Sequence, residues 1–403
     1  MNSQMMNGLL ESMIEHLELP DSTYEKAAFR YQDLGGWLCR EESTCAIYEP
    51  HIFPQGSFRL GTAIRPLDEK EEYDLDLACK LPVGIKKDSH TQKSVKMLVG
   101  NEIESYRVAR GIRDPKEEKH RCWRLDYADH MSFHMDIVPC IPEAQSRRQL
   151  IREAMTKTGI SYSLADTVSE LTVSITDNRH RSYSEICEDW NISNPEGYAK
   201  WFESSMKLAQ QLLLQKAGMF RAASIDDLPA YKWKTPLQRV IQLLKRHRDQ
   251  MFKDDPDVRP ISVIITTLAA AAYQGETDVE FALKNILSRI ETLVRLEAPK
   301  IPNPVDPNED FADRWTMPDC RHLKLEENFW NWIKQAKADF DILGRSDDTN
   351  FITEQGKQKF SVSMNPEELG KKIGLAHSFA TAVTPKSHTI TGTPAKPWAR
   401  RVC

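Results

Sequence analysis

The sequence predicts an α+β fold: a mixed sheet with flanking helices, followed by a mainly helical C-terminal lobe. Short segments that alternate apolar and polar side chains, as half-buried strands do, occur in the first 145 residues. From residue 146 onward, apolar residues recur mainly at helical spacing. A chain of 403 residues can bury a large core and should divide into about two or three lobes. We therefore expect a first lobe at 1–145, a helical lobe at 146–347, and an extension with a mobile tail at 348–403.

Two helices are predicted at the N-terminus, over residues 5–18 and 21–42. The second begins at Asp21 or Ser22, and Glu25 is placed to close a capping box on Ser22. An apolar stripe predicts that this helix forms a long spine behind the sheet; the stripe consists of Ala27, Tyr31, Leu34 and Leu38.

A strand and a tight turn are predicted next. Residues 46–53 form the strand, which ends at Pro54, and residues 57–64 begin a short helix. The turn between them, Gln55-Gly56-Ser57, would present backbone N–H groups and the Ser57 hydroxyl to an anion. A Gly-Ser pair after a proline is usually a plain turn, so its meaning depends on the strands that follow.

Carboxylates lie on one face of two further strands, predicted over 72–80 and 132–140. Successive side chains of a strand point to opposite faces, so Asp74 and Asp76 share one face and Leu75 takes the other. Asp136 repeats the pattern on the later strand. Carboxylates arranged in this way suit two divalent cations about 3.5–4 Å apart. Together with the turn, they predict a two-metal nucleotidyl-transfer site.

Each acidic residue also has a plainer interpretation. A D-x-D on a strand is commonly a solvated face, and a single aspartate in an apolar strand is commonly a hydrogen-bonded structural acid. The order and separation of the three features favour the catalytic interpretation. A carboxylate row on a strand otherwise fit for burial is costly unless a cation balances it.

The remaining elements are mainly helices, several of which begin at prolines. They are predicted over residues 93–110, 199–218, 236–251, 260–273, 278–296 and 325–342. Residues 121–127 are expected to pair with 132–140 as a hairpin, and the Pro-, Asn- and Asp-rich stretch 301–314 is expected to be a loop.

Composition argues against several classes of protein. The formal net charge of −5 argues against a general nucleic-acid-coating protein. The longest near-apolar stretch, 261–273, is too short to span a bilayer, and the N-terminus lacks the pattern of a secretion signal. The eight cysteines are scattered, which suits reduced thiols, although a zinc site using Cys320 and His322 stays open. We expect a cytoplasmic protein without a membrane or a stably bound nucleic acid as partner.

With these motifs in view, the chain resembles the cGAS/DncV-like nucleotidyltransferases (CD-NTases), a branch of the polymerase-β-like nucleotidyltransferase superfamily. Four stretches carry the resemblance: 54–62 (PQGSFRLGT), 73–76 (YDLD), 134–139 (HMDIVP), and 234–249 from KTPLQ to LLKRHRD. A fifth, 303–307 (NPVDP), resembles the loop that follows the helical core of these proteins. The first and third stretches indicate only the superfamily, whereas the full series indicates the CD-NTase branch. The resemblance implies a polymerase-β-like nucleotidyltransferase lobe closed by the helical lobe.

The resemblance also implies roles for individual residues. Ser57 and the backbone of Gly56 would hold the donor triphosphate. Asp74 and Asp76 would bind two Mg²⁺ ions, with Mn²⁺ as an alternative. Asp136 would complete the site for the ion that lowers the pKa of the attacking ribose hydroxyl.

Other positions have roles that the sequence leaves open. Lys245 matches a family lysine that contacts the triphosphate, a role that we favour over that of a solvated helix lysine. Ser262 lies where a second phosphate-contacting serine is expected, or is simply the first residue of a helix. Gln55 would support either the turn or the nucleotide. Arg246 and Arg248 are interpreted as solvated or paired rather than catalytic.

The function implied by the resemblance is synthesis of a cyclic di- or trinucleotide second messenger in bacterial antiphage (CBASS-type) signalling. The substrates would be NTPs, with ATP expected and GTP or a pyrimidine NTP as others. The segment 376–403 contains three prolines, four Lys or Arg residues and no acids. We interpret it as a mobile tail that is available to a defence-operon protein partner.

Two other functions stay open. An RNA-tailing or CCA-adding transferase, or an oligoadenylate synthase activated by double-stranded RNA, could be built on the same lobe. Such enzymes need an extended basic surface, which the net charge disfavours. A non-catalytic nucleotide-sensing scaffold is the third hypothesis, but binding alone would not require all three aspartates.

Overall fold

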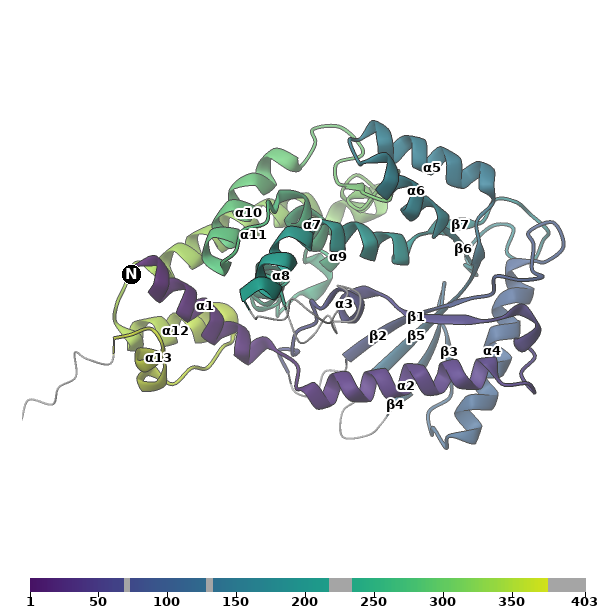
Figure 1. The fold of residues 1–403 in the computed structure, drawn as a ribbon, viewed down its shortest axis with the longest axis horizontal. Coiled ribbons are helices and arrows are strands. Elements are labelled where there is room, and N and C mark those ends of the chain that lie inside the picture. The colour runs from purple at the N-terminus through teal and green to yellow at the C-terminus, as the bar shows by residue number, and fades with distance from the viewer. Residues whose placement is uncertain (69–72, 128–132, 217–233, 376–403) are drawn as a thin grey trace, which may run out of the picture.

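A mixed sheet forms the first lobe of the computed structural model, which describes residues 1–68, 73–127, 133–216 and 234–375. Its main strands follow the order β1–β2–β5–β4–β3, in which β2 and β5 are parallel and the other neighbours are antiparallel (Figure 1). Their bounds are β1 (His51–Pro54), β2 (Tyr73–Lys80), β3 (Glu117–Glu118), β4 (Trp123–Tyr127) and β5 (Phe133–Pro142). The turn expected between β4 and β5 lies outside the described residues.

Two short strands from beyond residue 145 complete the sheet. β6 (Val173–Ile175) pairs with the end of β5, and β7 (Asn191–Ser193) pairs with β6. Part of the chain that we expected to be mainly helical therefore extends the first sheet.

Two helices cover one face of the sheet. The apolar residues of β2 and β5, including Leu75 and Met135, are buried against α2 (Asp21–Cys39) and α4 (Gln92–Ala109). Figure 1 shows α2 running along this face. The predicted alternation is confirmed, because the acidic side chains between these apolar residues lie on the opposite face, toward the helical lobe.

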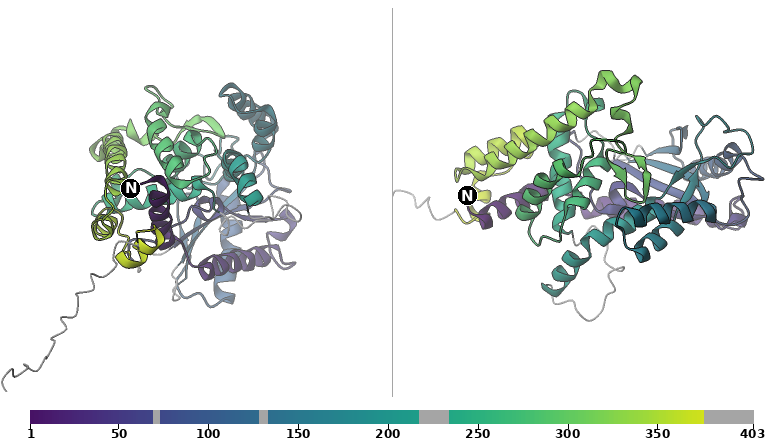
Figure 2. Two further views of the ribbon diagram at one scale, coloured as in Figure 1. Left: turned by 60° about the vertical axis from the view of Figure 1, so that its left-hand side comes forward. Right: turned by 90° about the horizontal axis from the view of Figure 1, so that it is seen from above.

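The helical lobe forms a second large core. It contains α5 (Gln145–Lys157), α6 (Tyr162–Glu170), α7 (Pro195–Lys216), α8 (Pro236–Met251), α9 (Ser262–Ala272), α10 (Val279–Leu293) and α11 (Leu325–Gly344). Helices α12 (Thr349–Phe360) and α13 (Pro366–Lys372) continue it, and α1 (Ser3–Leu17) packs against α8, α10 and α13. Both views of Figure 2 accordingly place the N-terminus beside the last helices. In the part of the chain that the structure describes, no helix has the length and apolar content needed to cross a membrane.

Three local predictions are wrong. Residues 46–53 are not one strand, because a 3-10 helix (Ala46–Tyr48) precedes β1 and Glu49 takes a left-handed conformation at φ 51°. Helix α2 begins after Pro20 without a side-chain cap, so the capping box on Ser22 does not form. The stretch expected to be a loop at 301–314 contains a hairpin of β8 (Pro302–Asn303) and β9 (Asp306–Asp310).

Helix α8 connects the lobes through side chains that bind backbone carbonyls after α3 (Gly56–Leu60). Gln238 Nε2 donates to the Leu60 carbonyl at 2.9 Å. Gln242 Nε2, one turn later, donates to the Ala63 carbonyl at 2.8 Å. Both glutamines are buried, so these bonds fix the position of α8 on the first lobe.

The contact between α4 and β4 yields a stability prediction. A Cβ added at Gly100 would overlap the buried indole of Trp123, whose Nε1 donates to the Lys96 carbonyl at 2.8 Å. We expect Gly100→Ala to lower the free energy of unfolding by about 1–3 kcal/mol, because the indole must move. Thermal unfolding, read as the change in Tm, measures this effect.

The matched control is Gly36→Ala in α2, where nothing lies within 4 Å of the added Cβ. That change should be neutral or stabilising by about 0.5–1 kcal/mol, because alanine restricts the unfolded chain. Equal losses of Tm in the two variants would contradict the packing argument.

Candidate functional site

A cavity of about 500 Å³ opens between the carboxylate-bearing face of the sheet and helices α7, α8 and α9. Every site residue predicted from the sequence except Asp136 lies in its wall. These residues are Gln55, Gly56, Ser57, Asp74, Asp76, Lys245 and Ser262. The fold thus brings together positions as far apart in the sequence as Gln55 and Ser262.

The turn between β1 and α3 holds Ser57 next to the carboxylates. The Gln55 backbone N–H donates to the Asp76 carbonyl at 2.8 Å. Gly56 has φ 65°, and a Cβ at this position would overlap the Asp76 carboxylate, so only glycine fits here without strain. The Gln55 side chain donates to the Leu77 carbonyl at 3.4 Å, which favours the turn-supporting role left open for it.

Strand register places charged side chains in two cross-strand rows. In the first row, Asp76 pairs with Asp136 across β2 and β5, and Asp136 pairs with Arg124 across β5 and β4. The second row lies two residues earlier on β2 and contains Asp74, His134 and Asp126. Side chains at paired positions lie on the same face as close neighbours, so both rows face the helical lobe.

The crowding of carboxylates changes the acidity of Asp76. Burial and, to a smaller extent, repulsion from Asp74 and Asp136 together raise its pKa to about 7, while Arg124 and Lys245 oppose the rise. A cation in the cavity would favour the ionised form of this carboxyl group.

Arg124 supplies part of that charge to the third aspartate. Its Nε and Nη2 donate to the two oxygens of Asp136 at 2.7 and 2.8 Å. This pair explains why Asp136 is not in the cavity wall. Sequence reasoning missed Arg124, although its spacing of two from Asp126 in WRLDY was a signal for a charged strand face.

Two oxygen-donor aspartates face the cavity where divalent metal ions would bind. Within the described ranges, no three His, Cys, Asp or Glu side chains are already arranged as a metal site. The chemistry nevertheless fits: Asp74 and Asp76 offer carboxylate oxygens to the cavity, and Asp136 is the adjacent residue in register. Asp136 could contribute only if Arg124 shared or released one of its oxygens.

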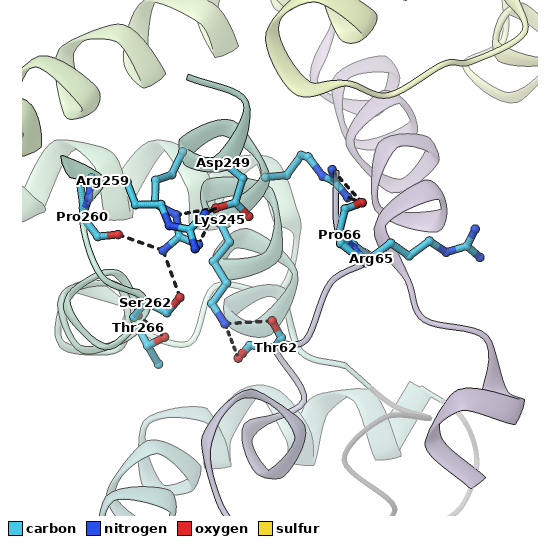
Figure 3. A network of polar contacts seen from close by, with 11 residues as sticks. Thr62, Arg65, Pro66, Lys245, Asp249, Arg259, Pro260, Ser262 and Thr266 are labelled. Atoms are coloured by element: carbon cyan, nitrogen blue, oxygen red, sulfur yellow. Dashed lines mark hydrogen bonds and ion pairs between the residues drawn. The ribbon is translucent and has the colours of Figure 1, made fainter. Parts of the chain in front are cut away.

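Lys245 reaches the cavity from α8 and is only 5% exposed, so its interpretation as a solvated lysine is wrong. Its Nζ donates to the carbonyl and the hydroxyl oxygen of Thr62, both at 3.1 Å (Figure 3). Burial and, to a smaller extent, the nearby Arg248 together lower the pKa of Lys245 to about 7, although Asp249 and Asp76 oppose this shift. An anion in the cavity would stabilise the charged form.

Ser262 begins α9 and is held by Arg248. The Nη1 atom of Arg248 donates to Ser262 Oγ at 3.0 Å and to the Pro260 carbonyl at 2.9 Å. Arg248 is buried in the cavity wall and paired with Asp249, so it is not solvated. Sequence reasoning could not place this arginine in the cavity wall, because that position depends on how α8 and α9 cross.

The sequence and fold were compared with known proteins. Residues 50–139 match the family model "Cyclic GMP-AMP synthase DncV-like, nucleotidyltransferase domain". The chain is 30% identical over 310 residues to a c-di-GMP synthase of Roseivirga ehrenbergii, covering 76% of this chain and 72% of that protein. It is 26% identical over 334 residues to the cyclic dinucleotide synthase CdnG of Bradyrhizobium diazoefficiens, covering 77% and 70%.

Solved structures share the fold. CdnG of Bradyrhizobium diazoefficiens in complex with GTP gives a TM-score of 0.61 at 19% identity, covering 92% of this chain and 98% of that one. A mutant of the Vibrio cholerae di-nucleotide cyclase DncV, in complex with ATP, GTP and 5MTHFGLU2, gives 0.54 at 14% identity, covering 88% and 94%. The α+β architecture predicted from the sequence is therefore confirmed.

The Roseivirga protein is similar enough, over enough of both chains, to establish the family. The match of residues 50–139 to a nucleotidyltransferase domain contains the turn and all three aspartates. The chain is a nucleotidyltransferase and belongs to the DncV-like CD-NTase family.

Proposed function

We propose that this nucleotidyltransferase joins two NTPs into a cyclic dinucleotide, with GTP as the main substrate and cyclic di-GMP as the product. The observation that carries the proposal is the convergence of Ser57, Asp74, Asp76 and Lys245 on one cavity. The choice of GTP is supported by the c-di-GMP synthase of Roseivirga ehrenbergii, to which the chain is 30% identical.

In the proposed reaction, Ser57 and Lys245 bind and orient the donor triphosphate. Lys245 would exchange its bonds with Thr62 for phosphate oxygens, which its charged form prefers. The ribose hydroxyl of the second nucleotide attacks the α-phosphorus in line. A P–O bond forms and pyrophosphate leaves, and a second transfer closes the ring.

The proposal includes two Mg²⁺ ions, with Mn²⁺ as an alternative, held by Asp74, Asp76 and Asp136. When bound, ions of this kind acidify an attacking hydroxyl and stabilise charge on the entering and leaving oxygens. The support is the carboxylate donor set and the raised pKa of Asp76, which burial and the neighbouring carboxylates Asp74 and Asp136 cause.

The cellular setting belongs to the same proposal. Cytoplasmic CBASS-type antiphage signalling is the role that the family resemblance implies for a cyclic-nucleotide synthase. The tail that we expected to meet a defence-operon partner, 376–403, lies outside the described residues.

The first test of function removes single carboxylates. We expect Asp74→Asn and Asp76→Asn each to reduce pyrophosphate release to less than about a tenth of the wild-type rate, because two cations need this charge. Mn²⁺ binding, followed by electron paramagnetic resonance, should weaken in parallel.

The matched control for this test is Asp126→Asn, which removes a carboxylate from the same sheet face at the row position paired with His134. It should keep most of the activity and the Mn²⁺ binding. Normal turnover by either of the first two variants would rule out the two-metal assignment.

A second prediction concerns stability and pH. Because the pKa of Asp76 is raised to about 7, the folded protein keeps a proton that the unfolded chain loses near pH 4. The stability contributed by this proton is lost as pH rises through about 7. Asp76→Asn has no carboxyl group to deprotonate at this position, so it avoids this loss of stability. The difference in Tm, variant minus wild type, should therefore increase between about pH 5 and pH 8 in metal-free buffer. A difference that shrinks over this range would contradict the pKa direction.

The product itself is the third test. Incubation with all four NTPs and Mg²⁺ or Mn²⁺, followed by phosphatase and mass spectrometry, should yield phosphatase-resistant cyclic di-GMP. Added RNA should have no effect on the yield. Linear oligomers that form only with RNA would instead favour a tailing enzyme or an oligoadenylate synthase.

A further inference from the structure

The β8–β9 hairpin contributes a polar and aromatic wall to the nucleotide cavity. Asn303 on β8, Glu309 on β9 and Phe311 just after it line the same cavity as Ser57 and Lys245. Phe311 meets Tyr198 of α7 edge to face, with ring centroids 6.3 Å apart. Aromatic side chains beside a polar group are the usual means of holding a nucleobase.

Asn303 fixes the position of the Glu309 carboxylate. The backbone N–H of Val305 donates to Asn303 Oδ1 at 3.0 Å, so Asn303 must turn its Nδ2 the other way. This Nδ2 donates to Glu309 Oε2 at 2.6 Å. Asn303 is buried, with 6% exposure, whereas Glu309 is exposed and lines the cavity. The wall therefore presents a carboxylate held in place from behind.

The second oxygen of this carboxylate, Oε1, has no hydrogen-bond partner among the residues that the structure describes. Desolvation, the largest effect, and the nearby Asp306 and Asp313 raise the pKa of Glu309, while the bond from Asn303 and the nearby Arg121 oppose the rise. The charged form is thus held at some cost. Hydrogen-bond donors from a ligand would offset that cost.

An ionised carboxylate only accepts hydrogen bonds, so it selects a base by the donors on that base. Guanine presents two adjacent donors, N1–H and the 2-amino group, on its Watson–Crick edge. Adenine presents an amino group beside the bare N1 acceptor, which the carboxylate repels. Cytosine and uracil likewise place acceptors next to their donors.

We propose that Glu309, held by Asn303, selects guanine by accepting hydrogen bonds from its N1–H and 2-amino groups in the nucleotide cavity. The inference rests on the proposed function and deepens it, since it assigns the choice of base to one side chain.

The test measures binding without turnover. The α,β-methylene analogues of GTP and ATP cannot undergo transfer at the α-phosphorus, and calorimetry gives their dissociation constants. Wild-type protein should prefer the GTP analogue by roughly ten- to a hundredfold, the usual discrimination of a bidentate base contact. Glu309→Gln replaces one acceptor with a donor and can still bind Asn303. It should lose most of this preference and leave affinity for the ATP analogue within about twofold.

Asp306→Asn is the matched control, because it removes the same charge from the same hairpin at a position outside the cavity wall. It should keep the wild-type preference. An unchanged GTP preference in Glu309→Gln, or an equal loss of affinity for both analogues, would overturn the inference.

The two proposals fail in different ways. Selective GTP binding by a wild-type protein that makes no cyclic dinucleotide would end the proposed function and leave the role of Glu309 standing. If Glu309→Gln still made cyclic di-GMP and kept full selectivity for GTP, the proposed function would stand and the role of Glu309 would be ruled out. In reactions with equal GTP and ATP, the supported outcome is a larger share of adenine-containing product from Glu309→Gln than from Asp306→Asn.

Discussion

The contact between α8 and the chain segment after α3 is the constraint on which the rest of the site depends. This segment, residues 60–66, is not paired within the sheet, and its buried carbonyls need donors from elsewhere. One edge of α8 supplies these donors, because its polar residues recur at helical spacing. Gln238 donates to the Leu60 carbonyl and Gln242 to that of Ala63. Lys245 donates to the Thr62 carbonyl and Arg246 to that of Arg65. The Ser57 turn and the helical lobe are thereby held in one arrangement.

The same contact gives Lys245 two uses. It donates to Thr62, and it also lies in the cavity wall beside the carboxylates. Burial lowers the pKa of Lys245 and raises that of Asp76, and both values come to about 7. In each residue, burial shifts the equilibrium toward the neutral form. A cation beside Asp76 and an anion beside Lys245 would reverse both shifts. A metal–triphosphate complex carries those two charges in one ligand, so it would be electrostatically complementary to this cavity.

The sequence predicted the parts of this site that depend on local pattern. Strand alternation placed Leu75 and Met135 in the core and the aspartates opposite, because a period of two leaves no other arrangement once one face is buried. The alternation in WRLDY indicated a charged strand face, but it could not place Arg124 beside Asp136, because that position depends on the register of β4 against β5. The hairpin that carries Glu309 was not predicted, because it contains prolines and asparagines, which are depleted in strands. Such features are set by pairing between segments and not by composition.

The Arg124–Asp136 pair explains how three carboxylates can share one sheet face without a bound cation. Without a cation, repulsion among Asp74, Asp76 and Asp136 would oppose folding. Arg124 neutralises the one farthest from the cavity, and Asp76 relieves the remainder by holding its proton more tightly. This sheet face is therefore stable with Asp74 and Asp76 open to the cavity and Asp136 paired with Arg124. A bidentate guanidinium–carboxylate pair has a specific geometry, so Asp136 would lose its bonds to Arg124 if it moved toward the cavity. Only a ligand with more positive charge than Arg124 would offset that loss.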